Sequence, residues 1–233
     1  MAVNTPAAHA AKKATTRIPI VITRVADPVK SGLVASLSQP GGNITGITFL
    51  PDELAGKRLQ LLKEAMPGVA RVAVLWSGNN TGADLSVIGM EAASSQLGLK
   101  LVRAPVVALA DFPAAVQVAV RDRAEAIIVV DDAFVTQHRN LLLSLAMKHA
   151  LPVASLFPPV AEAGGLIAYG PNTSVLYRRA ADYVDKVLRG AEPRSLPIEQ
   201  PTKFDLVINI KTAKALGLTI PPSLLLRADQ VIE

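Results

Sequence analysis

RVAVLWSGNNTGADLSVIGMEAASSQLGLKLVR, residues 71–103 of the chain, places a helical pattern between two strand-like runs. The first run, Arg71–Trp76, is apolar and rich in β-branched residues, which is typical of a strand. The amphipathic pattern of Gly82–Leu97 stops at Gly98, and a second β-rich run follows at Leu99–Arg103. A helix of this length is the usual crossover between parallel strands, so the stretch predicts a β-α-β unit.

The same alternation runs through the rest of the 233 residues. Residues 127–130 are apolar at every position, as expected for a central strand covered on both faces. We therefore expect an α/β fold with parallel sheets. The further predicted strands are Ile18–Val25, Ile44–Phe49, Ala126–Val130, Pro152–Ser155, Leu166–Tyr169 and Phe204–Ile210. The further predicted helices are Pro6–Thr15, Val29–Ser38, Asp52–Met66, Phe112–Arg121, Val135–His149 and Ser174–Arg189.

The composition excludes several classes of protein. The chain has no cysteine, which excludes a disulfide framework, a cysteine zinc site and a thiol nucleophile. It has three histidines, too few to favour a histidine-based metal site. Half of the residues are hydrophobic and the net charge is only +5, so intrinsic disorder is excluded as well. We expect neither a cofactor nor a metal.

The charge pattern bears on partners and on localisation. Basic residues occur in scattered pairs without interleaved aromatic residues, so we expect no nucleic-acid partner. The most apolar stretch, Val102–Val120, is interrupted by prolines and by charged residues, so we expect no membrane span. Ala8–Ala10 has the A-x-A form of a signal cleavage site, but no charged and apolar leader precedes it, and the chain as written carries no export signal.

Proline-marked segments predict two lobes. Phe49–Pro51, Phe157–Pro159 and Pro193–Pro197 are stiff, and three such crossings would join two α/β lobes through a hinge; ordinary surface loops are the alternative. The alternation of strands and helices begins with a helix, Pro6–Thr15, and not with a strand. Thr5 is the expected N-cap of this helix. We therefore expect that at least one upstream strand is missing from this chain.

Small polar clusters follow the carboxyl ends of the predicted strands, where open α/β sheets bind their ligands. Helix N-termini at such ends favour a carboxylate, and Asp27 or Asp132 could neutralise an ammonium group, which together suit a small zwitterion or polar solute. The alternative is that these residues only cap helices. Asp131–Asp132 also resembles a Mg²⁺ or phosphoryl-transfer site. The clusters are Asn4–Thr5, Asp27–Pro28, Ser77–Asn79, Asp131–Asp132 and Gly170–Thr173.

Aromatic residues make up only 4% of the chain, and four of them lie at or just after predicted strand ends. Rings at such positions could form the apolar wall of a cleft. We expect Trp76 and Phe134 to pack in the core. Phe157, at a predicted hinge crossing, and Tyr169, beside a strand end, are the better candidates for the wall.

Several long stretches resemble a known family. Residues 14–50, 53–76, 161–172 (AEAGGLIAYGPN) and 177–233 are similar, in order and spacing, to the substrate-binding proteins of bacterial ABC uptake systems, the group that includes tryptophan/tyrosine-type solute receptors. The resemblance implies a type I periplasmic-binding-protein fold, with two parallel-sheet lobes, a three-segment hinge and no catalysis. It also implies that this chain is an N-terminally truncated member whose lobe one is incomplete.

The resemblance further implies the division of the chain and its partners. Lobe one would comprise residues 1–49 and 158–194, and lobe two residues 50–157 and 195–233. The protein would be an exported, periplasmic or membrane-anchored monomer that captures a small solute by hinge closure and docks on a membrane permease. The implied ligand-binding residues are Asn4, Thr5, Asp27, Ser77, Asn79, Asp131, Asp132, Phe157 and Tyr169.

Other functions stay open at this point. The same fold occurs in ligand-sensing modules of transcription regulators, although this chain contains no helix-turn-helix. A doubly wound enzyme would use Asp131–Asp132 for catalysis. A truncated chain without function is a third reading, because an open sheet edge invites aggregation. An aromatic amino acid is the solute that the resemblance favours, and short peptides, other amino acids and sugars remain alternatives.

Overall fold

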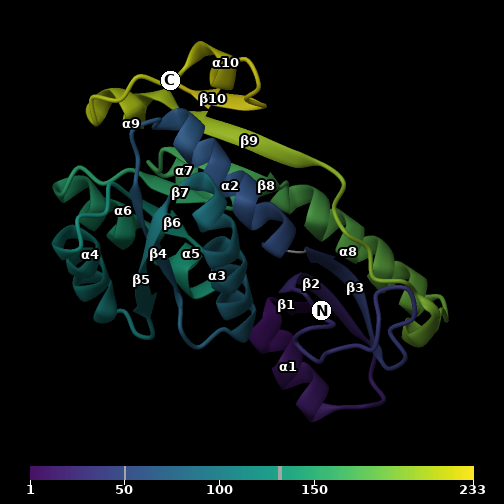
Figure 1. Ribbon diagram of the computed structural model, residues 1–233. Coiled ribbons are helices and arrows are strands. Elements are labelled where there is room, and N and C mark those ends of the chain that lie inside the picture. Colours follow the sequence, from purple (N-terminus) through teal and green to yellow (C-terminus); the bar gives the residue numbers. More distant parts are fainter. Residues whose placement is uncertain (50, 131–132) are drawn as a thin grey trace.

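The computed structural model describes residues 1–49, 51–130 and 133–233, and these form two lobes, each built on its own sheet (Figure 1). We define lobe one as the three-stranded sheet with the helices that pack on it, and lobe two as the seven-stranded sheet with its helices. The N-terminus lies in lobe one and the C-terminus in lobe two (Figure 1). Each lobe combines a sheet with helices that pack on it, which confirms the predicted α/β class.

Lobe one contains three parallel strands with a helix on each face. The strands β1 (Ala2–Val3), β2 (Ile20–Ala26) and β3 (Ile44–Phe49) follow one another across the sheet. On one face, α1 (Thr5–Ala14) packs its buried Ala8 with the even-numbered isoleucines of β2. On the other face, α8 (Thr173–Leu188) packs against Val21. Alternating side chains of one strand therefore serve two separate apolar clusters.

Lobe two contains a seven-stranded sheet in the order β10-β9-β8-β7-β6-β4-β5. Every neighbouring pair is parallel except β8 and β9, which are antiparallel. The central strand β6 is buried along its whole length, as its uniformly apolar sequence predicts. The strands are β4 (Arg71–Ser77), β5 (Lys100–Val106), β6 (Ala126–Val129), β7 (Val153–Ser155), β8 (Ile167–Pro171), β9 (Phe204–Asn209) and β10 (Gln230–Ile232).

Helices cover both faces of this sheet and complete two apolar cores. One face carries α2 (Pro51–Ala65), α3 (Thr81–Ser94), α9 (Ile210–Ala215) and α10 (Pro222–Leu225). The other face carries α4 (Asp111–Arg121), α5 (Ala133–Gln137), α6 (Arg139–Lys148) and α7 (Pro158–Glu162). Two short 3-10 helices complete the elements, Ser95–Leu97 and Pro193–Ser195. Within the described parts of the chain, no helix combines the length and the apolarity that crossing a bilayer requires.

Two predicted helices differ in the structure. Residues 27–43, which link β2 to β3, form turns where Val29–Ser38 was expected to be helical. Gly32 adopts a φ of 70° there, and the Ser36 hydroxyl accepts a hydrogen bond from the backbone N–H of Gln39. Short polar side chains that bond the local backbone favour turns over helix. The second predicted helix, Val135–His149, is divided into α5 and α6.

The chain passes between the lobes three times, but the second passage lies later than predicted. The sheet pairing places β8 in lobe two, so the first part of the range 158–194, up to Pro171, lies in lobe two, whereas α8 in its later part packs on lobe one as predicted. Phe157–Pro159 is no hinge, because Pro158 opens α7 with Phe157 as its N-cap residue. The passages therefore lie between β3 and α2, between β8 and α8, and in the segment before β9.

The third passage is fastened to lobe one through α8. Leu176, Ala180 and Tyr183 form the buried stripe of this helix. The Tyr183 hydroxyl donates a hydrogen bond to the carbonyl of Pro197 (2.6 Å), and burial raises the pKa of this phenol above its usual range. The backbone N–H of Thr48 on β3 also donates to the carbonyl of Glu199 (2.9 Å). Residues 196–199 therefore move with lobe one, and any bending between the lobes falls between them and β9.

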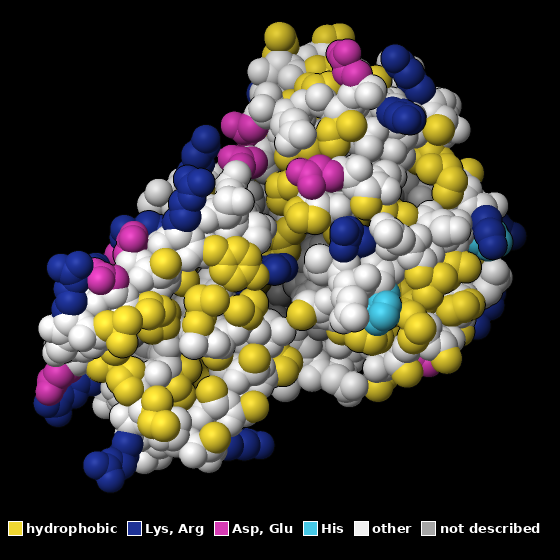
Figure 2. All heavy atoms as spheres, turned by 180° about the vertical axis from the view of Figure 1, so that it is seen from behind, with side chains coloured by type: hydrophobic (Ala, Val, Ile, Leu, Met, Phe, Trp, Pro, Cys, Tyr) yellow, Lys and Arg dark blue, Asp and Glu magenta, His cyan; other side chains and the backbone are white. Residues whose placement is uncertain are grey.

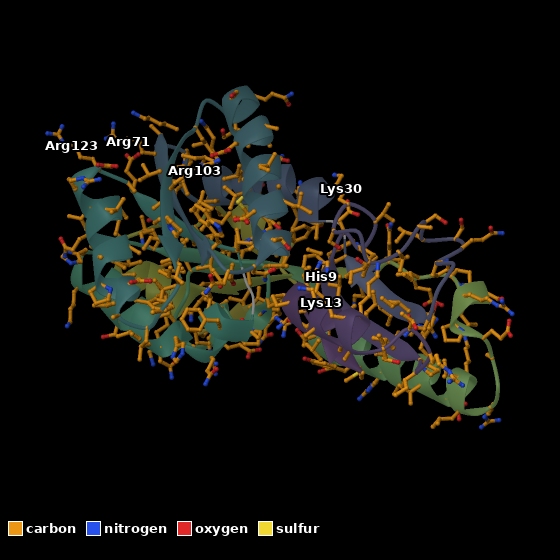
Figure 3. All side chains as sticks on the ribbon, turned by 90° about the horizontal axis from the view of Figure 1, so that it is seen from below. His9, Lys13, Lys30, Arg71, Arg103 and Arg123 are labelled. Atoms are coloured by element: carbon orange, nitrogen blue, oxygen red, sulfur yellow. The ribbon has the colours of Figure 1, made fainter. Side chains whose placement is uncertain are left out.

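Basic side chains are spread over both lobes. Figure 3 shows Arg71 and Arg123 on the end of lobe two that lies away from lobe one, whereas His9 and Lys13 lie on α1. The Arg71 side chain donates to the carbonyl of Arg123 (2.7 Å), so the two are held together at the amino end of the lobe two sheet. These labelled side chains lie outside the pocket described next.

Candidate ligand-binding site between the lobes

A pocket lies between the two lobes, where strands of both sheets end. The space free of protein atoms there, including solvent at the open side, amounts to about 470 Å³. The surface is hollowed at the junction of the lobes, with Lys or Arg side chains beside the hollow (Figure 2). Lobe one contributes Val3, Asn4, Thr5, Arg24, Ala26 and Phe49; lobe two contributes Arg58, Asn80, Gly82, Ala83, Ser86, Val130, Ala133, Leu156 and Phe157.

The lobe one side of the pocket is built around the start of α1. Asn4 caps this helix by accepting a hydrogen bond from the backbone N–H of Ala7 (3.0 Å), so Asn4 is the N-cap where the sequence predicted Thr5. Thr5 is buried, and its hydroxyl accepts from the backbone N–H of Ala26 on β2 (3.2 Å). Both side chains thus fix the geometry of the pocket wall while they line it.

The lobe two side is built around the start of α3. Asn80 caps the helix by accepting from the backbone N–H of Gly82 (3.0 Å), and the Ser86 hydroxyl donates to the carbonyl of Gly82 (3.2 Å). The lobes touch here, because a Cβ atom on Gly82 would lie 2.5 Å from the hydroxyl oxygen of Thr5 and 3.0 Å from the Cβ of Ala26. Only glycine permits this close approach of α3 to lobe one.

Two phenylalanines form the apolar wall. Phe49 ends β3 and Phe157 follows β7, and their rings meet edge to face with centroids 6.0 Å apart. The guanidinium of Arg24 lies over the ring of Phe157, 4.0 Å from its centroid. This is a cation–π geometry, so the aromatic face that points toward lobe one is covered by a positive charge.

Each lobe places one guanidinium in the pocket. Arg24 comes from β2 in lobe one, and Arg58 comes from α2 in lobe two. Arg58 is only 4% exposed and donates to the carbonyl of Val129, at the carboxyl end of β6. The N-termini of α1 and α3 add partial positive charge on both sides. These groups favour a ligand that carries an anionic group such as a carboxylate.

Comparison with models of protein families shows the family to which this chain belongs. The model described as "ABC transporter substrate binding protein" matches residues 1–232. The chain belongs to this family. The match confirms the resemblance derived from the sequence and extends over both lobes.

Individual relatives in the substrate-binding family give the same result. A tyrosine-binding protein of Clostridioides difficile (strain R20291) is 26% identical over 218 residues, which are 93% of this chain and 62% of the relative. The chain thus spans less than two thirds of that relative. The ABC domain in complex with L-Trp from Streptococcus pneumonia is 28% identical, with a TM-score of 0.92; the alignment covers 99% of this chain and 77% of that one.

A third relative differs in the arrangement of its lobes. The ligand-free, open structure of a substrate binding protein with adhesive properties from Clostridium difficile is 26% identical, and the alignment covers 99% of this chain and 76% of that one. Its TM-score is only 0.69, although identity and coverage nearly equal those of the L-Trp complex. The overall similarity of this chain is thus higher to the L-Trp complex than to the open form.

Three of the predicted site residues line the pocket, namely Asn4, Thr5 and Phe157. Two others, Asp131 and Asp132, lie outside the described residues. The remaining four lie elsewhere, and each has a structural reason. They are Asp27, Ser77, Asn79 and Tyr169.

Local hydrogen bonds and packing explain these four positions. Asp27 accepts from the backbone N–H of Lys30 (2.9 Å) and forms an ion pair with its ammonium group (3.5 Å), so its carboxylate stabilises the turn after β2. Ser77 is buried at the end of β4, and its carbonyl accepts from the N–H of Asn80 (3.1 Å). Asn79 is exposed. The ring of Tyr169 packs beside that of Phe204, with centroids 6.0 Å apart.

Both arginines of the pocket and the capping Asn80 are absent from the residues predicted from the sequence. The only charged residue of a largely apolar strand, IVITRVA at Ile20–Ala26, was the signal available for Arg24. Arg58 lies among leucines of α2 that are buried. A charged residue within such an apolar pattern was a comparable signal for Arg58. Among residues 1–49, 51–130 and 133–233, no group of three or more histidine, aspartate or glutamate side chains is placed to hold a metal ion.

Proposed function

We propose that this chain is the solute-binding component of a bacterial ABC uptake system and captures a small carboxylate-bearing solute between its lobes. The observation that carries the proposal is the pocket itself. The carboxyl ends of strands from both sheets line it, each lobe supplies one guanidinium, and phenylalanine rings form its wall. Sites at the carboxyl ends of parallel strands are where α/β folds bind ligands.

Capture would proceed by hinge closure. A solute that touches both lobes favours the closed arrangement by its differential affinity for the two forms. The contact of Gly82 with Thr5 and Ala26, and the higher TM-score with the L-Trp complex, support a closed arrangement here. Release would reverse the motion, and binding and release require no catalytic step.

The chemistry of the pocket favours an aromatic amino acid as the solute. Its carboxylate would meet the guanidinium groups and the helix N-termini, and its ring would pack against Phe49 and Phe157. Asp131 and Asp132 follow Val130 in the sequence, and we assign them to the ammonium group. The relatives named for tyrosine and crystallised with L-Trp support the same class of solute.

The partners follow from the family. Substrate-binding proteins of ABC systems work outside the cytoplasmic membrane, so we assign this chain to an exported, periplasmic or membrane-anchored protein. Its closed form would dock on a membrane permease and deliver the solute there. We expect a purified monomer to bind the solute without the permease.

A thermal-shift screen followed by calorimetric titration tests the proposed function. The chain is screened against L-tryptophan, L-tyrosine, L-phenylalanine, aliphatic amino acids and sugars. A ligand present at a hundred times its Kd stabilises the folded chain by about 2.7 kcal/mol, which raises Tm by roughly 5–10 °C for a chain of this size. We expect such a rise with an aromatic amino acid. Stabilisation by sugars alone would overturn the proposal.

A further inference from the structure

Arg24 occupies an unusual position in the sheet of lobe one. It lies within β2, where the pairing with β3 shifts register between Ile22 and Val25, and its φ is 55°. A side chain other than glycine rarely adopts this left-handed conformation, and the surrounding structure must impose it. The shift turns the side chain out of the alternation of the strand and into the pocket between the lobes.

Within the described residues, the guanidinium of Arg24 has an aromatic neighbour but no anionic one. It lies 4.0 Å from the centroid of the Phe157 ring. No carboxylate of the described chain forms an ion pair with it. The side chain is partly buried, so it has given up part of its hydration without gaining a counter-charge from the part of the chain that the structure describes. A ligand carboxylate would supply this counter-charge in a bidentate geometry.

The side chain of Arg24 takes up part of the pocket that an amino acid would need. Arg24 covers the face of Phe157 on which a ligand ring would stack. Rotation of its long, flexible side chain would free this face and bring the guanidinium to the other end of the ligand.

We propose that Arg24 selects for the carboxylate of the ligand, and that it leaves the ring of Phe157 to pair with this carboxylate when the ligand's apolar side chain takes its place. The inference rests on the proposed function and deepens it. Arg24 is then a specificity-determining residue, which separates amino acids from the corresponding amines. The neighbouring Phe157 provides affinity for both.

The experiment compares ligands with and without a carboxylate by calorimetric titration. L-tryptophan is paired with tryptamine, and L-tyrosine with tyramine, against the unmodified chain, Arg24→Gln and Arg24→Lys. Arg178→Gln is the matched control, because Arg178 is exposed on α8 and lies outside the pocket. Circular dichroism and Tm establish that each variant is folded.

We expect Arg24→Gln to weaken binding of the amino acids by 10- to 100-fold and to change binding of the amines by less than about twofold. Arg24→Lys should retain an intermediate affinity, and Arg178→Gln should match the unmodified chain. Equal losses for amino acid and amine, or no loss at all, would overturn the role of Arg24 and leave the proposed function standing.

The unmodified chain alone provides a second test that needs no folded variant. It should bind L-tryptophan at least tenfold more tightly than tryptamine, and equal affinities would contradict selection for the carboxylate. If the unmodified chain binds no amino acid and no amine, the proposed function itself fails, and the role of Arg24 fails with it.

Discussion

Glu125 illustrates how one side chain secures the amino end of the lobe two sheet. Its carboxylate accepts hydrogen bonds from the backbone N–H groups of Ala70 and Arg71, both at 2.8 Å. These two bonds lower the pKa of Glu125 below its ordinary value. A lowered pKa in the folded chain means that the ionised form stabilises the fold above the pKa of the unfolded chain. This stabilisation is lost as the pH falls through the folded value.

Glu125→Gln should therefore destabilise the chain in a pH-dependent way. The amide keeps one acceptor oxygen but removes the charge, and because the side chain is partly in water we expect a loss of about 0.5–1 kcal/mol at pH 7. The difference in Tm from the unmodified chain should shrink between pH 5 and roughly pH 3. Glu162 is exposed, so Glu162→Gln serves as the control and should lose no stability at pH 7 or at low pH. A loss of stability from Glu125→Gln that is as large at low pH as at pH 7 would contradict this account.

At the level of single residues, the sequence locates polar strand ends but does not tell which side chains face the pocket. Asn79 and Asn80 are neighbours of the same type, yet Asn79 is exposed and Asn80 is buried against the pocket. The difference depends on where α3 begins, and helix ends shift by a residue or two in any reading of sequence. Asp27 does not line the pocket, and its carboxylate bonds the local backbone at Lys30 instead.

At the level of elements, the start of α8 joins the two lobes through one residue. Asn172 caps the helix by accepting from the backbone N–H groups of Ser174 (3.0 Å) and Val175 (3.2 Å). Its amide nitrogen also donates to the carboxylate of Asp205 on β9 (2.7 Å). The second passage between the lobes is therefore held at both sides, and Asn172 fixes the direction in which α8 leaves lobe two.

Asn172→Ala should remove both the cap of α8 and the hydrogen bond to Asp205. We expect it to lower the free energy of unfolding by about 1–2 kcal/mol, as lost caps usually do. Asn172→Ser keeps an oxygen for the cap and loses the bond to Asp205, so it should recover at least half of this loss. Chemical denaturation with urea measures both variants. Identical stabilities of the alanine and serine variants would show that the cap does not stabilise α8.

The order of elements could be predicted from apolar periodicity because most strands and helices here are regular. The exceptions have physical causes. Residues 27–43 connect two adjacent parallel strands without a helix, and local turn bonds replace helical ones. Pro158–Pro159 looked like a stiff linker but starts α7, since proline suits both roles and only the packing of β8 in lobe two decides between them.

On the scale of the whole molecule, closure depends on one close contact between the lobes. Gly82 at the start of α3 approaches lobe one so closely that a Cβ atom would overlap the Thr5 hydroxyl and crowd Ala26. In an open form these groups separate, and a larger residue would meet nothing there. A substitution at Gly82 should therefore act on the equilibrium between the two forms.

Gly82→Ala should weaken solute binding by roughly tenfold, because the closed form must absorb the overlap, which corresponds to about 1.4 kcal/mol. The Tm of the chain without solute should stay within about 2 °C of the unmodified value. Gly56→Ala on α2 is the control, since its Cβ would meet only Ala93, at an ordinary 3.4 Å. Titration calorimetry gives the affinities, and unchanged binding by Gly82→Ala would contradict the role of this contact.

The existence of two lobes was predictable from proline-marked segments and from the family resemblance. The two separate sheets confirm the lobes, and the family match confirms the resemblance. The exact division was not, because α8 packs on lobe one whereas β8, which precedes it, pairs in lobe two. Such a division depends on contacts between residues far apart in the chain. Periodicity along the sequence carries no information about them.

Small-angle X-ray scattering of the chain, with and without a saturating amino acid identified by the ligand screen, tests the central claim most directly. The account predicts that the radius of gyration falls when the solute binds, and that the bound profile matches the two-lobed arrangement of Figure 1. Binding by calorimetry with no change in the scattering profile would contradict capture by closure of the lobes.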